Sequence, residues 1–154
     1  MVKVEKIGEK QSKKFVENFK PNCLIVVTHP RCGHCVAMKP ALEEAYDDLE
    51  NLYTGDTTVF DLHGDAVEES KQHIKQLNSV DGFPTLLIVK DKDADPIIYE
   101  GNRSKEDIIK FMTDNLDVKP KKGGKKSRKA RKSRKARKSR KARKSRKAQI
   151  KKRR

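Results

Sequence analysis

Two cysteines separated by two residues, Cys32 and Cys35, constrain this chain more than any other feature of its sequence. Thiols at this spacing can form and break a disulfide, so the motif Cys-Gly-His-Cys indicates redox chemistry. The same spacing could hold half of a zinc site, but the chain has only three cysteines, so His29 and His34 would have to supply the remaining ligands. The sequence therefore favours a redox motif, and we expect neither a metal ion nor a cofactor.

The residues around the motif predict where it lies in the fold. The apolar, β-branched run 24–27 is typical of a buried strand, and apolar residues recur at helical spacing from 36 to 49. The motif is therefore expected at the N-terminus of a helix, where free backbone amides and the helix dipole favour a thiolate. Positive charge on Arg31 and His34 adds to this effect, so we predict that Cys32 is the nucleophile.

The other two cysteines are expected to play different parts. Cys35, one helical turn further on, is predicted to be the more buried, resolving thiol. His34 lies between the two thiols, where it can stabilise the reduced form and make the disulfide more oxidising. Cys23 precedes the buried strand and is expected to pack as a small apolar side chain.

Charge divides the chain into two parts. Residues 1–118 contain all 22 acidic and 15 basic residues, a net charge of −7, whereas residues 119–154 contain 23 basic residues and no acidic one. We predict a globular domain over 1–118 and a disordered Lys/Arg-rich tail over 119–154, because the tail has almost nothing apolar to bury.

The tail repeats the unit Ser-Arg-Lys-Ala-Arg-Lys from Ser127, Ser133 and Ser139, and a fourth copy from Ser145 is degenerate. Such a polycation binds nucleic acid or another polyanion by releasing counterions, without reading base sequence. A nuclear localisation signal or an anionic membrane surface would be the alternative interpretations. The predicted contacts are Arg128, Lys129, Arg131, Lys132, Arg134, Lys135, Arg137, Lys138, Arg140, Lys141, Arg143 and Lys144.

Apolar periodicity and turn residues predict the other elements of the first domain. Strands are expected over 2–7, 24–27, 57–62, 86–89 and 96–99, and helices over 9–19, 36–53, 67–77 and 105–116, the last capped by Ser104. The order β-α-β-α-β-α-β-β-α indicates an α/β fold in which a central mixed sheet is flanked by helices.

This order, together with the Cys-Gly-His-Cys motif, resembles the thioredoxin superfamily, and the motif itself resembles the catalytic domains of protein disulfide isomerases. The resemblance covers about residues 1–118 and extends to Pro40 inside the long helix. It implies a thioredoxin fold and a cis bond before Pro84, at which Gly82, Phe83 and Pro84 meet the substrate backbone. Without the resemblance, Pro84 would be interpreted only as a loop breaker.

The resemblance also implies that Arg103 approaches the second cysteine of the motif, although an ion pair with Glu106 or Asp107 would explain this arginine equally well. Two residues depart from the family pattern. Arg31 stands where tryptophan is usual, and Val26 stands where a buried acid usually relays the proton of the second cysteine. Without that acid, either the resolution of mixed disulfides is slow, or water, His34 or a lysine has to take its place.

Two functional hypotheses follow. The first is a thiol–disulfide oxidoreductase or isomerase that acts on protein disulfides and is tethered to nucleic acid by its tail. The alternative is a nucleic-acid-binding or virion packaging protein whose thioredoxin scaffold is catalytically impaired. The chain has no apolar run of membrane-spanning length and no apolar signal segment at its N-terminus, so we expect a monomer in the cytoplasm, the nucleus or a virion, with a large DNA virus as one source.

Overall fold

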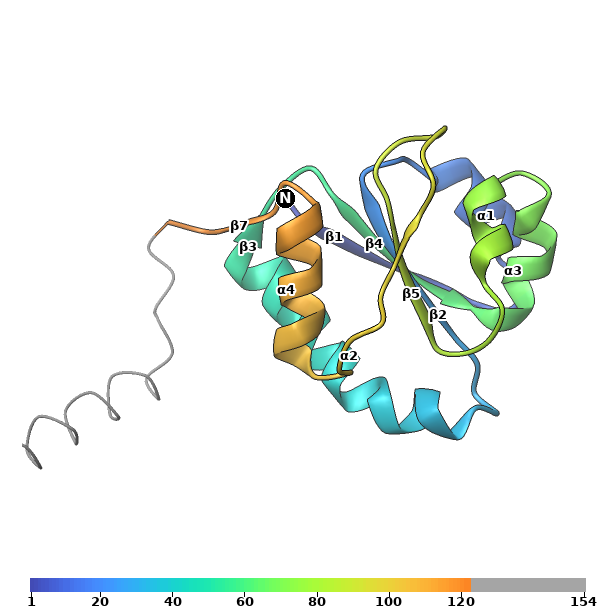
Figure 1. The fold of residues 1–154 in the computed structure, drawn as a ribbon, viewed down its shortest axis with the longest axis horizontal. Coiled ribbons are helices and arrows are strands. Elements are labelled where there is room, and N and C mark those ends of the chain that lie inside the picture. The colour runs from blue at the N-terminus through green and yellow to red at the C-terminus, as the bar shows by residue number, and fades with distance from the viewer. Residues whose placement is uncertain (123–154) are drawn as a thin grey trace, which may run out of the picture. The chain divides into compact units, whose positions relative to one another are not determined.

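A five-stranded mixed sheet forms the centre of the structure, a computed structural model that describes residues 1–122 (Figure 1). The strands are β1 (Lys3–Ile7), β2 (Cys23–Thr28), β4 (Thr58–His63), β5 (Thr85–Val89) and β6 (Ile97–Ile98), in the spatial order β1-β4-β2-β5-β6. β1 and β2 both pair with β4 in parallel, and β5 and β6 continue the sheet in antiparallel pairing. Every strand predicted for this sheet is therefore present.

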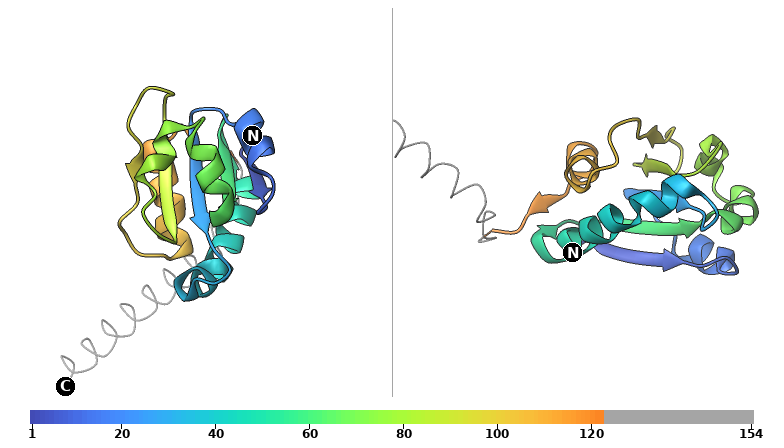
Figure 2. Two further views of the ribbon diagram at one scale, coloured as in Figure 1. Left: turned by 90° about the vertical axis from the view of Figure 1, so that its right-hand side faces the viewer. Right: turned by 90° about the horizontal axis from the view of Figure 1, so that it is seen from below.

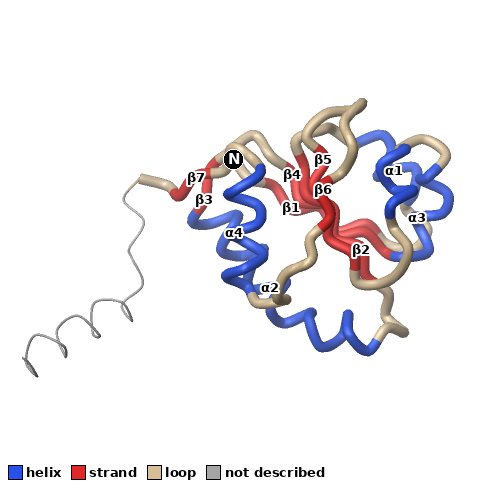
Figure 3. Tube along the Cα trace, in the orientation of Figure 1, coloured by secondary structure: helices blue, strands red, loops and turns tan. Residues whose placement is uncertain are grey.

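Helices cover both faces of the sheet. They are α1 (Ser12–Asn18), α2 (Gly33–Leu52), α3 (Gly64–Lys71) and α4 (Lys105–Asn115), with a 3₁₀ turn, η1, at Lys75–Ser79. α2 and α4 lie together on one face, and α1 and α3 on the other (Figures 1 and 2). The strands thus run between two helical layers (Figure 3), and the predicted thioredoxin fold is confirmed.

The central strand β2 explains why its sequence is apolar throughout. Successive side chains of a strand point to opposite faces, and both faces of this sheet are covered. Leu24 and Val26 pack into the core beneath α2 and α4, whereas Cys23, Ile25 and Val27 pack into the core beneath α1 and α3. Burial raises the pKa of Cys23 to about 12, so this cysteine is the small, inert core residue predicted from the sequence.

Two parts of the fold differ from the sequence prediction. The helix expected over 67–77 ends at Lys71, because Ile74 takes an extended backbone, and the chain then continues as η1. A second, two-stranded sheet was not predicted: β3 (Tyr53–Thr54) pairs in antiparallel orientation with β7 (Lys119–Pro120). Two residues are too few to produce a recognisable sequence pattern.

The pairing of β3 with β7 extends the contacts of the domain beyond the boundary expected at residue 118. The Lys121 amide donates a hydrogen bond to the Leu52 carbonyl (2.8 Å), and the compact unit runs from Met1 to Lys121. The predicted polyanion contacts from Arg128 to Lys144 lie outside the described residues. Among residues 1–122, no helix has both the length and the apolar character needed to cross a membrane.

Candidate active site

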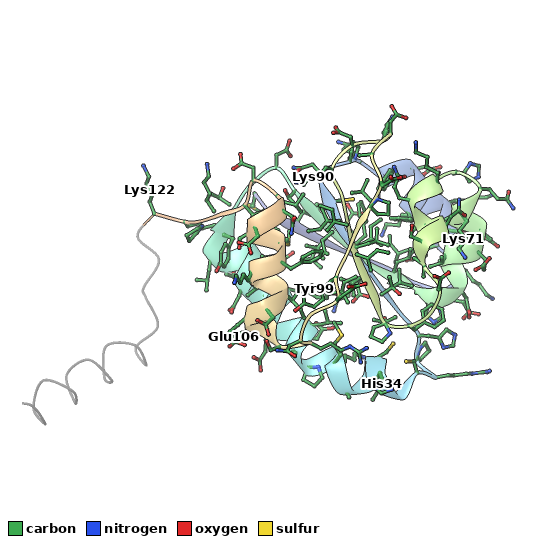
Figure 4. The ribbon with its side chains drawn as sticks, in the orientation of Figure 1. His34, Lys71, Lys90, Tyr99, Glu106 and Lys122 are labelled. Atoms are coloured by element: carbon green, nitrogen blue, oxygen red, sulfur yellow. The ribbon has the colours of Figure 1, made fainter. Side chains whose placement is uncertain are left out.

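The turn between β2 and α2 places Cys32 at the position that caps the helix. β2 ends at Thr28, and the Cys32 amide donates to the His29 carbonyl (3.0 Å), so that α2 begins directly after the first cysteine. His34 is exposed on the first turn of the helix, where it is labelled in Figure 4. The helix N-terminus predicted for the motif is therefore present.

The two thiols of the motif lie in different environments. Hydrogen bonding from the Cys35 thiol, and then from the backbone amides of Cys35 and His34, lowers the pKa of the partly exposed Cys32. Cys35 is buried, and this burial raises the pKa of its thiol, although the His29 amide acts in the opposite direction. Cys32 is therefore the thiol that more readily becomes a thiolate, and Cys35 stays protonated.

Arg103 adds a positive charge near both thiols. It lowers the pKa of Cys32 and of Cys35, although hydrogen bonding and burial are the larger causes of their shifts. Arg31, His34 and Arg103 are all exposed, so water screens their charges. The arginine implied by the family resemblance therefore lies near enough to favour the thiolate of each cysteine.

A tyrosine holds the loop that carries Arg103. The Tyr99 hydroxyl donates a hydrogen bond to the Asn102 carbonyl, one residue before Arg103. The Tyr99 ring packs against Phe111 of α4, with ring centroids 4.8 Å apart, and is labelled in Figure 4. Tyr99 therefore holds the loop in two ways: its hydroxyl binds the loop backbone, and its ring packs against α4.

The loop before β5 faces the first cysteine. The Cys32 thiol donates a hydrogen bond to the Phe83 carbonyl (3.4 Å), and the Phe83–Pro84 peptide bond is cis, as predicted. The Thr85 hydroxyl donates to the Gly82 carbonyl (2.7 Å), which closes the loop on itself. Gly82 and Phe83 are exposed, so the three residues predicted to meet substrate lie at the surface beside Cys32.

His29, named above as a possible zinc ligand, supports this loop. The His29 ring stacks on the Phe83 ring, with centroids 5.5 Å apart and planes inclined by 26°. Gly64, the first residue of α3, packs beneath both rings, and a Cβ there would lie 2.6 Å from the Phe83 ring. The absence of a side chain at Gly64 is therefore what gives the Phe83 ring its place.

His29 also belongs to a cluster with His63 and Asp65, whose possible ligand atoms lie within 4.8 Å of one another. Their hydrogen bonds indicate which imidazole nitrogens act as acceptors and which act as donors. His29 Nδ1 accepts from the Arg31 amide (3.1 Å), which leaves Nε2 to donate to Asp65 Oδ1 (3.2 Å). His63 Nδ1 accepts from the Asp65 amide (3.2 Å) as the cap of α3. These hydrogen bonds tie the turn after β2 to the start of α3.

A cavity of about 430 Å³ lies next to the buried thiol, between the first half of α2 and the ends of β1, β2 and β4. Its lining includes Cys35, Lys6, Lys39, Glu43, Asp61 and His63. Asp61 is the residue opposite Val26 in the pairing of β2 with β4. The site therefore does contain a partly buried acid, one strand away from the position where the family resemblance places it.

Neither Asp61 nor Gly64 was predicted from the sequence to be a site residue. Asp61 had a detectable signal, because it is an acid within the apolar strand 57–62, and a parallel strand with both faces covered seldom contains one. Gly64 had no comparable signal, since it follows a strand and begins a helix, where glycine is common.

Comparisons with known proteins agree with this geometry. A protein-family model described as Thioredoxin matches residues 3–114. Protein disulfide isomerase-like 1-1 of Arabidopsis thaliana is 35% identical over 109 residues, which are 70% of this chain and 20% of that protein. A protein disulfide-isomerase of Aspergillus oryzae is 34% identical over 101 residues, which are 60% of this chain and 18% of that protein. This chain thus spans only about a fifth of the length of these curated relatives.

Among solved structures, the J-Trx1 fragment of ERdj5 superposes on this chain with a TM-score of 0.54. The alignment covers 74% of this chain and 52% of the fragment, at 16% sequence identity. At that identity the likeness establishes a shared fold and nothing more specific.

Proposed function

Because this chain belongs to the thioredoxin family, we propose that it is a thiol–disulfide oxidoreductase that exchanges or isomerises protein disulfides through Cys32 and Cys35. The observation that carries the proposal is the difference between the two thiols. The pKa of Cys32 is lowered by hydrogen bonds at a helix N-terminus, and the pKa of Cys35 is raised by burial. An attacking thiol and a resolving thiol need this order of acidity.

The reaction begins when the Cys32 thiolate attacks one sulfur of a substrate disulfide, which gives a mixed disulfide and releases the other substrate sulfur as a thiolate. The exposed Phe83 carbonyl and the loop around Pro84 offer backbone groups and an apolar ring to the substrate polypeptide. Cys35 then attacks Cys32 and frees the substrate. The Arg103 charge stabilises the thiolate form of each cysteine in turn.

Insulin reduction with dithiothreitol as electron donor tests this proposal. We expect the full chain to precipitate insulin B chain faster than dithiothreitol alone, and Cys32→Ser to abolish the acceleration. Cys23→Ala is the matched control, because it removes the third thiol from the opposite core and should leave the rate unchanged. If the wild-type chain does not accelerate the reaction, the domain is not an oxidoreductase.

We further propose that the tail binds nucleic acid or another polyanion and so tethers the enzyme in the cytoplasm, the nucleus or a virion. The supporting observation is the sequence itself, with 23 basic and no acidic residues in 119–154. The alternative, a packaging protein with an impaired scaffold, draws support from Val26 and Arg31. Full-length protein that retards DNA in a gel but fails the insulin assay would favour that alternative.

A further inference from the structure

The cavity beneath the first half of α2 brings together the Cys35 thiol and the Asp61 carboxylate, which come from different layers of the fold. We propose that Asp61 accepts the proton of Cys35 when this thiol attacks the mixed disulfide at Cys32, and returns the proton in the reverse reaction. The proposal rests on the proposed oxidoreductase function and assigns to it a residue that handles the proton.

The strand register directs Asp61 towards this cavity. Val59, two residues earlier in β4, packs beneath α2 and α4, whereas Phe60 and Leu62 pack beneath α1 and α3. Asp61 shares the face of Val59, because side chains two apart in a strand lie on the same side. Across the pairs Val26↔Asp61 and Lys6↔Asp61, its neighbours in the sheet are an apolar side chain and a lysine.

The groups that face Asp61 leave its carboxylate free to exchange a proton. They are Lys6 from β1, Lys39, Glu43 and Tyr46 from α2, and, at the edge of the cavity, Cys35 from α2 and His63 from β4. The Lys6 ammonium is held by both oxygens of Glu43, each at 2.9 Å, and within residues 1–122 no cation lies within ion-pair distance of Asp61. Burial therefore dominates and raises the pKa of Asp61, although the Lys6 charge and the neighbouring Tyr46 hydroxyl act in the opposite direction.

The cavity has room and polar partners for the water that would link the two groups. A water molecule takes about 30 Å³ of liquid and needs two to four polar neighbours, and the cavity measures about 430 Å³. The polar groups of its lining include the side chains of Lys6, Lys39, Glu43 and His63 beside Asp61.

In the proposed step, the Cys35 S–H gives its proton through water to the Asp61 carboxylate, and the resulting Cys35 thiolate attacks Cys32 Sγ. The Cys32–Cys35 disulfide forms while the bond between Cys32 and the substrate sulfur breaks, and that sulfur leaves with the electron pair and takes a proton from solvent. The two protein cysteines are oxidised by two electrons, the substrate disulfide is reduced, and Asp61 later releases its proton to the cavity.

A single-turnover experiment on the full chain separates the two chemical steps. The reduced protein is mixed with oxidised glutathione, quenched with acid and analysed by mass spectrometry for the glutathione adduct at Cys32 and for the Cys32–Cys35 disulfide. We expect Asp61→Asn to form the adduct at the wild-type rate but to resolve it at least tenfold more slowly near neutral pH, since general base catalysis contributes about 10²–10⁴-fold. The control is Asp47→Asn, which removes an exposed carboxylate from α2. This variant should resolve the adduct at the wild-type rate.

The pH profile distinguishes a proton acceptor from a merely structural residue. In the wild type, resolution should be nearly independent of pH between the pKa of Asp61 and that of Cys35. In Asp61→Asn it should rise tenfold per pH unit, because only pre-formed thiolate can react, and it should approach the wild-type rate as the pH nears the pKa of Cys35. Asp61→Glu should restore most of the flat profile.

The outcomes keep this inference apart from the proposed function. If the wild type forms no adduct at Cys32, the proposed function itself fails. If the wild type forms and resolves the adduct while Asp61→Asn resolves it with an unchanged rate and an unchanged pH profile, Asp61 is not the proton acceptor. A thermal melt of each variant shows whether it is folded, and Asp61→Glu provides the test if Asp61→Asn does not fold.

Discussion

Gly64→Ala tests whether the missing side chain at the start of α3 positions the loop that faces Cys32. The new Cβ would lie 2.6 Å and 2.8 Å from two carbons of the Phe83 ring and 3.1 Å from His29 Cδ2. Carbon atoms in contact prefer about 3.5–4.0 Å, so the ring must move by about 1 Å. The Phe83 carbonyl accepts a hydrogen bond from the Cys32 thiol, so a shift of the Phe83 backbone together with its ring would displace the group that faces Cys32.

Two opposing terms set the stability of this variant. Overpacking costs about 1–3 kcal/mol, whereas replacing glycine by alanine in a helix gains at most about 1 kcal/mol. The net effect should be a loss of about 1 kcal/mol, or about 4 °C in Tm for a domain of this size. In a Phe83→Ala background the main clash is absent, so Gly64→Ala should raise Tm. The contact geometry thus predicts that Gly64→Ala lowers Tm when Phe83 is present and raises it when Phe83 is replaced by alanine.

The variant should also lose catalytic activity. A displacement of about 1 Å at a reacting centre can cost up to about 10²-fold in rate, and we expect about a tenfold loss of kcat/KM for insulin with little change for a small disulfide such as bis(2-hydroxyethyl) disulfide. Gly8→Ala is the control, because its Cβ meets nothing closer than Gln11 Oε1 at 3.6 Å. A Gly64→Ala variant with wild-type kcat/KM and Tm would refute the reasoning.

Three further predictions concern charge. In the reduced native protein, iodoacetamide near neutral pH should label Cys32 and spare Cys35 and Cys23, as read by peptide mass spectrometry; equal labelling would contradict the assignment. Asp61→Asn should raise Tm at neutral pH but not in acid, because an acid whose pKa is raised by folding loses stability as the pH rises from its unfolded pKa to its folded pKa, and the loss is complete above the folded pKa. Deleting 123–154 should abolish DNA binding; with six phosphate contacts, log K for the full chain falls against log salt with a slope of about −5.

Most of the fold could be predicted because burial and helix capping leave patterns in short stretches of the sequence. The strand over 24–27 is apolar throughout since both of its faces are covered, and Ser104 begins α4 by accepting the Asp107 amide (3.3 Å), as its capping pattern predicts. The exceptions depend on tertiary contacts. The pairing of Tyr53–Thr54 with Lys119–Pro120 arises only because the chain returns past the end of α2, which no pattern in either dipeptide records.

The site divides in the same way. Cys32 and Cys35 form a local motif, and the cis bond before Pro84 was predicted from a local match. Asp61 and Gly64 have roles that exist only through their neighbours in other strands and loops, since one lies opposite Val26 in the strand register and the other lies under the Phe83 ring. The sequence could mark Asp61 as unusual, but it could not indicate the cavity that it lines.

The position of Asp61 also explains how the site can keep an acid when residue 26 is a valine. β2 and β4 are adjacent and parallel, and their register places residues 26 and 61 side by side on the face covered by α2. Neighbouring strands are about 4.8 Å apart, so an acid that moves from one strand to the next still lies under the same helix and lines the same cavity as Cys35. Under the proposed mechanism the carboxylate has to border the cavity that Cys35 lines, and Asp61 does so. Val26 therefore does not imply an impaired site, and the resolution kinetics of Asp61→Asn measure whether the second position is in use.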